Sequence, residues 1–265
     1  MHLKRWLSGL IMAAGLILFV AYAPPLLFLL LILFLTVLGL GEFYAMSLPR
    51  IPPGERITGL LLGALIPLSL SSKEPRCLIA GLALILLSLL ILALFQQEEF
   101  PALVEKVGKH LLGLLYVSFL LAHFLLLRKL EWGRGWVLFT LVATYFGDTA
   151  AFYIGRSWGR QKLAPKISPS KTIEGGLGGV AGSVIGSLLF KIFFFPQLSS
   201  SHALVLGFGV GVISQLGDLW ESLIKRSAGV KDSGTLIPGH GGLLDRIDSV
   251  LFAGPFVYYY VWGVV

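Results

Sequence analysis

The sequence is poor in charged side chains for its length. Asp, Glu, Lys and Arg make up 13% of its 265 residues, whereas hydrophobic residues make up 56%. The mean hydropathy is +0.85. Apolar stretches of about 20 residues cross a bilayer as helices, and such stretches recur along the whole chain. This composition excludes an ordinary soluble domain and predicts an all-α polytopic integral membrane protein.

The sequence has a single cysteine and lacks the common nucleotide-binding motif of ATPases. Cys77 is the single cysteine, so an intrachain disulfide and a cysteine-based metal site are both excluded. The sequence holds no GxxxxGK[ST] motif, which excludes a P-loop ATPase. The net charge of +7 does not predict a nucleic-acid partner, because basic loops of membrane proteins set topology and contact anionic lipid headgroups.

The apolar runs predict about nine transmembrane helices. Residues 1–23 have the basic start and apolar core of a signal peptide, but Pro24 and Pro25 lead directly into another apolar run. We therefore expect a retained first helix. The expected spans are residues 6–23, 26–48, 56–72, 76–96, 109–127, 135–155, 175–196, 203–224 and 246–264.

The distribution of basic residues predicts the orientation. Most of the 21 Lys and Arg residues fall in cytoplasmic segments if the N-terminus is cytoplasmic, as the positive-inside rule favours. The C-terminus is then outside, and the polar loops 156–174 and 225–245 share the cytoplasmic side of the inner membrane. We expect three regions: 1–75 as scaffold or lipid access, 76–130 as a helical hairpin suited to a homodimer contact, and 131–265 as the catalytic helices.

Small residues recur at helical spacing in the C-terminal third. Gly178, Gly182 and Gly186 are four residues apart in the seventh expected span, as are Gly207 and Gly211 in the eighth. Small residues at this spacing let helix backbones approach closely in lipid. The pattern predicts a tight helix bundle and indicates packing, not chemistry.

Acidic residues inside apolar spans are functional candidates by default, because a charge is costly there. Asp148, Asp218 and Glu221 are such cases. Glu221 precedes Lys225 by four residues, so a plain ion pair along one helix is an equally good explanation for it. Glu42 lies in a different region and is compatible with either role; we leave it outside the predicted site.

The stretch Ser222–Asp248 is the most polar part of the C-terminal half. Asp245 and Asp248 are three residues apart, so they share one face of a helix. Two such carboxylates are unfavourable without a cation between them, which is an ordinary setting for Mg²⁺. Eight of its side chains are charged or histidine: Lys225, Arg226, Lys231, Asp232, His240, Asp245, Arg246 and Asp248.

Two shorter segments offer phosphate contacts. In SPSKTIEGG, a helix capped by Ser170 or Thr172 would present N–H groups beside Lys171 to a phosphate; a solvated basic loop is the alternative. In PGHGG, the glycines permit close approach to a ligand. His240 there suits a phosphate contact or a turn better than a metal, because no second His lies nearby.

Carboxylates for Mg²⁺ and cations for phosphates at one membrane face are the minimum set for phosphoryl or nucleotidyl transfer. The run SLIKRSAGVKDSGTLIPGHGGLLDRID resembles the signature of the phosphatidate cytidylyltransferases, also called CDP-diacylglycerol synthases. GDTAAFYIGR and SPSKTIEGG also look like segments of that family. The resemblance covers about residues 140–250, and the N-terminal half is similar only in its apolar helices.

The resemblance implies the reaction of CTP with phosphatidic acid, giving CDP-diacylglycerol and pyrophosphate, with Mg²⁺ and room for a second cation. It implies metal ligands at Asp218, Asp245 and Asp248, which with Lys225 form the catalytic set. Phosphate binding falls to Lys171, Arg226, Lys231, His240, Gly241, Gly242 and Arg246. Supporting roles fall to Asp148, Glu174, Glu221 and Asp232.

Two alternatives compete with this prediction. One is a related CTP-using membrane enzyme such as a polyprenol kinase, which would transfer the γ-phosphate; the full signature argues against it. The other is an ion-coupled transporter with Asp148, Asp218 and Glu221 along its pathway. Transporters often carry internal repeats and midplane sites, whereas this chain shows no evident repeat and its charges gather near one surface.

Overall fold

The structure is a computed structural model that describes residues 15–72, 74, 76–236 and 241–265. Residues 15–22 are helical and lead into α2 (Pro25–Ser47), α3 (Pro53–Ser71) and α4 (Arg76–Leu94). A long rod follows, made of α5 (Phe100–Gly113), the π-helical segment η1 (Leu114–Phe119) and α6 (Leu120–Lys129). The C-terminal helices are α7 (Gly133–Trp158), α8 (Ile173–Phe194), α9 (Ser200–Ser227) and α10 (Leu244–Val264).

A helix lies at each of the eight expected spans after the first. Six helical segments are long and apolar enough to cross a membrane, which defines a multi-pass membrane protein. They are Pro25–Ser47, Arg76–Leu94, Phe100–Lys129, Gly133–Trp158, Ile173–Phe194 and Ser200–Ser227. The first expected span lies largely outside the described residues. The total of nine spans and their orientation remain predictions.

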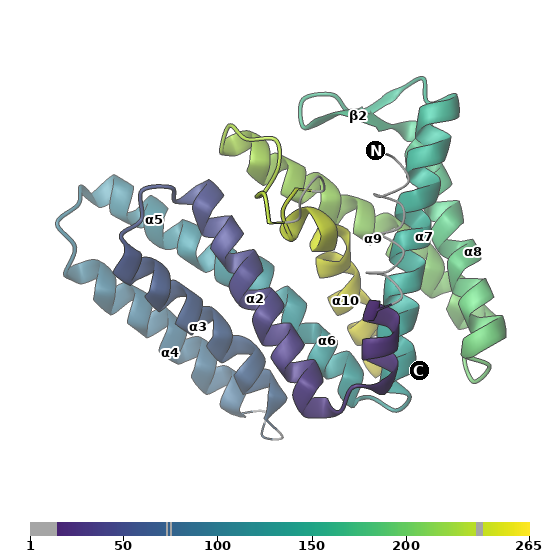
Figure 1. The fold of residues 1–265 in the computed structure, drawn as a ribbon, viewed down its shortest axis with the longest axis horizontal. Helices are drawn as coiled ribbons and strands as arrows, with labels where there is room; N and C mark the ends of the chain where they lie inside the picture. The colour runs from purple at the N-terminus through teal and green to yellow at the C-terminus, as the bar shows by residue number, and fades with distance from the viewer. Residues whose placement is uncertain (1–14, 73, 75, 237–240) are drawn as a thin grey trace.

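The helices form two groups with α10 between them (Figure 1). Helices α2 to α6 lie on one side, and α7, α8 and α9 lie on the other. Helix α10 packs against α9 and α7 in one group and against α6 and α2 in the other. The last helix of the chain therefore connects the N-terminal helices to the C-terminal bundle.

The glycine pattern produces the predicted tight bundle. A Cβ at Gly178 would lie 2.5 Å from Ile154 of α7, and one at Gly211 would lie 2.7 Å from the Cα of Val180 of α8. Such distances leave no room for a side chain, so the backbones of α7, α8 and α9 are in close contact. Without a hydrophobic driving force between helices in lipid, this close packing is a main source of association.

One element departs from the all-α prediction. Strands β1 (Lys162–Ala164) and β2 (Ser168–Thr172) form a small antiparallel hairpin between α7 and α8. Lys162 pairs with Thr172, and Ala164 pairs with Ser168. The hairpin lies at the end of the molecule where α7 ends and α8 begins (Figure 1). It gives the predicted basic loop a defined shape.

Candidate functional site

The two polar segments singled out in the sequence meet at one end of the bundle. Lys171 of β2 forms an ion pair with Asp218 of α9, with 2.7 Å between Nζ and Oδ2. The Nε of Arg226, also on α9, donates to the carbonyl of Ile167 over 3.3 Å. Residues some 50 positions apart in the chain thus become neighbours, as expected for loops on the same side.

A cavity of about 450 Å³ opens between α7, the hairpin, α8 and α9. Its charged lining residues are Asp148, Arg156, Lys171 and Asp218. Thr172 caps α8: its hydroxyl accepts the N–H of Gly175 over 3.1 Å. This confirms one of the two cap candidates, whereas Ser170 lies in β2. A helix N-terminus beside a lysine is a ready anion site.

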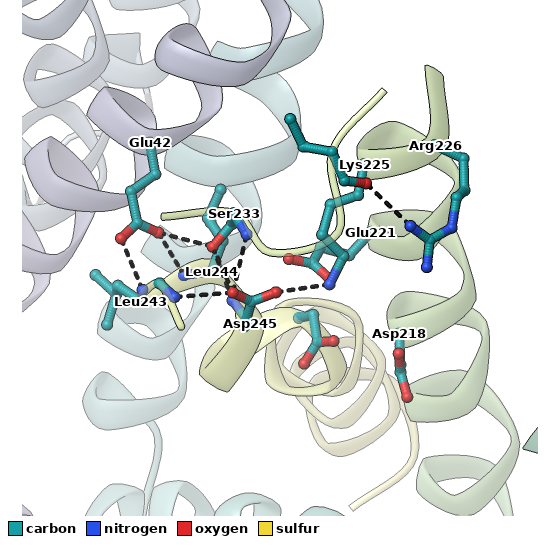
Figure 2. Close-up of polar contacts among 12 residues, drawn as sticks. Glu42, Asp218, Glu221, Lys225, Arg226, Ser233, Leu243, Leu244 and Asp245 are labelled. Atoms are coloured by element: carbon teal, nitrogen blue, oxygen red, sulfur yellow. Dashed lines mark hydrogen bonds and ion pairs between the residues drawn. The ribbon is translucent and has the colours of Figure 1, made fainter. Parts of the chain in front are cut away.

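A buried ion-pair group lies on the other side of α9. Lys225 contacts Glu221, which confirms the predicted pair along the helix, and also Asp245, with 2.6 Å between Nζ and Oδ1. The Glu221 side chain is only 1% exposed. One cation therefore serves two carboxylates from different helices and joins α9 to the start of α10 (Figure 2).

The second oxygen of Asp245 is also engaged. Oδ2 accepts the backbone N–H groups of Ser233 and Gly242 over 2.9 and 2.8 Å. Asp245 lies just ahead of the expected span 246–264. Burial raises the pKa of its carboxyl, but hydrogen bonds from Lys225, Gly242 and Ser233 outweigh this and lower the pKa below its ordinary value. Asp245 is thus a charged carboxylate that organises the loop before α10.

Glu42 belongs to the same cluster, although we left it outside the predicted site. Its carboxylate accepts the N–H groups of Leu243 and Leu244 over 2.8 and 2.9 Å. Figure 2 shows Glu42 reaching this loop from α2, opposite Lys225 on α9. The available signal was one acid in an otherwise uncharged helix. Its partners, about 200 residues away, could not be read from local sequence.

Ser249 of α10 connects Asp248 of the same helix to Asp148 of α7. The Asp248 Oδ1 accepts the N–H of Ser249 over 2.8 Å, and the Ser249 hydroxyl lies 3.4 Å from the Asp148 Oδ1. Asp248 also interacts electrostatically with Asp218, Glu221 and Asp148. Asp148 of α7 and Asp218 of α9 line the cavity, and Asp248 of α10 is connected to Asp148 through Ser249.

The donor set suits a metal only in part. Within the described ranges, no three His, Cys, Asp or Glu side chains form a group that could hold a metal ion by themselves. Mg²⁺, however, is usually held by one or two carboxylates with substrate phosphates and water as further ligands. Asp218 and Asp248 are compatible with that arrangement, with one Asp218 oxygen paired with Lys171 and one Asp248 oxygen accepting the N–H of Ser249. Asp245 fits less well, because its oxygens already accept Lys225, Ser233 and Gly242.

The remaining predicted residues lie around this centre. Glu174 accepts the N–H groups of Arg160 and Gln161, which fixes the start of the hairpin to α8. Lys231 and Asp232 are exposed in the loop before α10. The backbone carbonyl of Arg246 accepts the hydroxyl of Tyr145. Gly241 has a φ of +84° and adjoins Asp245. His240 lies outside the described residues.

Fold and site together define a multi-pass membrane protein with a polar cavity, lined by Lys171 and the N-terminus of α8, and with carboxylates at the same end of its helices. The sequence matches the cytidylyltransferase family over residues 3–264. The chain belongs to this family.

Curated relatives agree with the family match. The chain is 33% identical to a phosphatidate cytidylyltransferase of Bacillus subtilis, over 97% of this chain and 96% of the relative. It is 36% identical to the phosphatidate cytidylyltransferase of a Synechocystis species, over 84% of each chain. It is 32% identical to that of Thermotoga maritima, over 84% of this chain and 83% of the relative.

Proposed function

We propose that the protein transfers CMP from CTP to phosphatidic acid, forming CDP-diacylglycerol and pyrophosphate. The observation that carries the proposal is the cavity in which Lys171 and the α8 N-terminus face Asp148 and Asp218. The family match and the names of the relatives give the substrates. A site built into apolar helices suits a substrate that is itself a membrane lipid.

In this reaction one phosphorus–oxygen bond forms and another breaks. A phosphate oxygen of phosphatidic acid attacks the α-phosphorus of CTP, and the bond to the bridging oxygen of the β-phosphate breaks. Pyrophosphate leaves with that electron pair. A phosphomonoester with a second pKa of about 6 is largely ionised near neutral pH. Positioning and charge neutralisation, more than a strong base, then supply the rate.

We assign the cations to these phosphates. Lys171 and the N–H groups at the start of α8 suit the triphosphate, because they line the same cavity. Lys225, Arg226, Lys231 and Arg246, with Gly241 and Gly242, remain our proposal for further phosphate contacts. Lys225 also forms ion pairs with Glu221 and Asp245. In this assignment it therefore stabilises the fold and binds phosphate.

Mg²⁺ is part of the proposal. Asp218 and Asp248 would hold it together with substrate phosphate oxygens, and it would neutralise the charge that develops on the triphosphate. The engaged oxygens of Asp245 support a role in ordering the loop before α10; direct metal binding by Asp245 would require it to release some of those partners.

We further propose that the protein lies in the inner membrane with its N-terminus and this site on the cytoplasmic side, where CTP is available. The basic segments predicted to be cytoplasmic support this orientation. A homodimer through the helical hairpin of residues 76–130 remains a prediction.

The test uses detergent-purified protein with phosphatidic acid, Mg²⁺ and CTP labelled with ³²P at the α-position. We expect label in the extracted lipid, lost with EDTA and strongly reduced in Lys171→Met. Lys109→Met is the matched control, since Lys109 forms an ion pair with Glu105 on the exposed face of α5. Lipid labelled only from γ-³²P-CTP would replace the proposal with a lipid kinase.

A further inference from the structure

Glu42 has an unusual environment for an acid in a membrane helix. It is the single charged residue of α2 between Pro25 and Ser47. A charge at such a position is costly unless other groups compensate it. Here Leu243 and Leu244 donate their backbone N–H groups to its two oxygens. The N–H groups that compensate the Glu42 charge therefore belong to the start of α10.

Helix α10 needs such a partner from elsewhere. The first N–H groups of any helix have no acceptor within the helix, and the N-cap residue here is Leu243, whose apolar side chain cannot accept a hydrogen bond. A carboxylate at a helix N-terminus satisfies these N–H groups and is favoured by the helix dipole. Glu42 of α2 thus caps α10, about 200 residues away in sequence.

The loop before α10 is shaped around this carboxylate. The Ser233 hydroxyl lies 3.0 Å from both a Glu42 oxygen and an Asp245 oxygen. A Cβ at Gly234 would lie 2.8 Å from the Glu42 Oε1, and one at Gly242 would lie 2.7 Å from the N atom of Gly234. At Gly242 a side chain would meet backbone, which cannot move aside, whereas at Gly234 it would meet the Glu42 carboxylate, which its hydrogen bonds hold in place. Glu42, Ser233 and Asp245 form one continuous contact, which we call the Glu42 junction.

We propose that Glu42 is a positioning residue for CMP transfer. By capping α10 and contacting Ser233, it fixes the helix turn that carries Asp245 and Asp248. It acts through these groups and touches neither substrate. The expected effect on kcat rests on the proposed function. The capping of α10 by Glu42 does not depend on it, because it is a property of the fold.

The first measurement is independent of activity. Hydrogen–deuterium exchange of residues 241–248 is compared between the unaltered protein and Glu42→Gln. An amide side chain has one acceptor oxygen where the carboxylate has two, so we expect faster exchange in this segment. Glu55→Gln is the control, because Glu55 is paired with Lys106 of α5 and not with the loop before α10. Unchanged exchange in Glu42→Gln would overturn the cap.

The second measurement is kinetic. A shift of about 1 Å in a catalytic group can cost on the order of 100-fold in rate, so we expect kcat to fall about 10- to 100-fold in Glu42→Gln. KM for CTP should change little, and Glu55→Gln should keep its kcat in the folded fraction. Faster exchange of residues 241–248 with unchanged kcat would reduce Glu42 to a structural cap and overturn the positioning role.

A third variant, Ser233→Ala, tests the same contact and can be used if the Glu42→Gln protein does not fold. It removes one hydroxyl of the Glu42 junction and buries no new charge. We expect a reduced kcat alone, and a combined loss in the double variant smaller than the product of the two single losses, because contacting residues are not independent. Full activity of folded Ser233→Ala, or independent losses, would contradict the junction. An unaltered protein that labels no lipid refutes the proposed function instead.

Discussion

At the scale of single residues, Lys225 compensates the charge of two largely buried carboxylates. It pairs with Glu221 and Asp245, and the Glu221 side chain is 1% exposed. Lys225→Met would leave two largely buried carboxylates, Glu221 and Asp245, without their counter-charge, and such a change typically costs about 3–5 kcal/mol. We expect a clearly lower thermal midpoint in detergent, measured by the loss of helical circular dichroism.

A second substitution separates charge from packing. Adding Glu221→Gln to Lys225→Met neutralises one of the two carboxylates that lost their counter-charge, while Asp245 keeps the N–H groups of Ser233 and Gly242. We therefore expect part of the lost thermal midpoint to return while CMP transfer stays low. A midpoint for Lys225→Met equal to that of the unaltered protein would show that the ion pairs contribute little to stability.

Asp218 should behave differently, because its pair with Lys171 is partly exposed, with 36% of the Asp218 side chain accessible. Such pairs contribute about 0–1 kcal/mol, so Asp218→Asn should hardly change the thermal midpoint. If Asp218 holds Mg²⁺, we expect activity to fall at least about tenfold and the Mg²⁺ concentration for half-maximal rate to rise. An unchanged Mg²⁺ titration would remove Asp218 from the metal site.

At the scale of elements, the close contact of α8 and α9 is a sensitive packing feature. A Cβ at Gly211 would lie 2.7 Å from the backbone of Val180, and backbone cannot move aside as a side-chain tip can. Overpacking of this kind typically costs about 1–3 kcal/mol. We therefore expect Gly211→Ala to lower the thermal midpoint.

Gly108→Ala is the matched control in α5. A Cβ there would meet no atom within 4 Å in the described part of the chain. Alanine also favours helix over glycine, so this variant should be neutral or slightly more stable. Equal losses in both variants would mean that the midpoint reports helix content and not the α8–α9 contact.

The elements also show what sequence alone can predict. The helices were predictable because each apolar run is long enough to cross a bilayer, and the Gly178–Gly186 pattern was predictable because its spacing is local. The hairpin was missed because Lys162–Ala164 and Ser168–Thr172 are short, polar and interrupted by proline. The role of Glu42 was missed because its partners are contributed by α10, and no local pattern reports such a contact.

At the scale of the whole molecule, the single cysteine offers a test of orientation. Cys77 is exposed at the start of α4, an end predicted to face outside. In spheroplasts, a membrane-impermeant maleimide should label it. In a Cys77→Ser chain, Lys162→Cys in the exposed hairpin should be labelled only after lysis. The reverse pattern would invert the predicted orientation.

The Glu42 junction also has a consequence for how the protein is made. Glu42 is separated by 201 and 202 positions from Leu243 and Leu244, whose N–H groups its carboxylate accepts. While α2 is being inserted into the bilayer, the N–H groups that will receive its carboxylate have not been synthesised. The contact can form only when the final helix emerges from the ribosome. A chain that stops before α10 therefore carries the Glu42 carboxylate without the backbone N–H groups that compensate it.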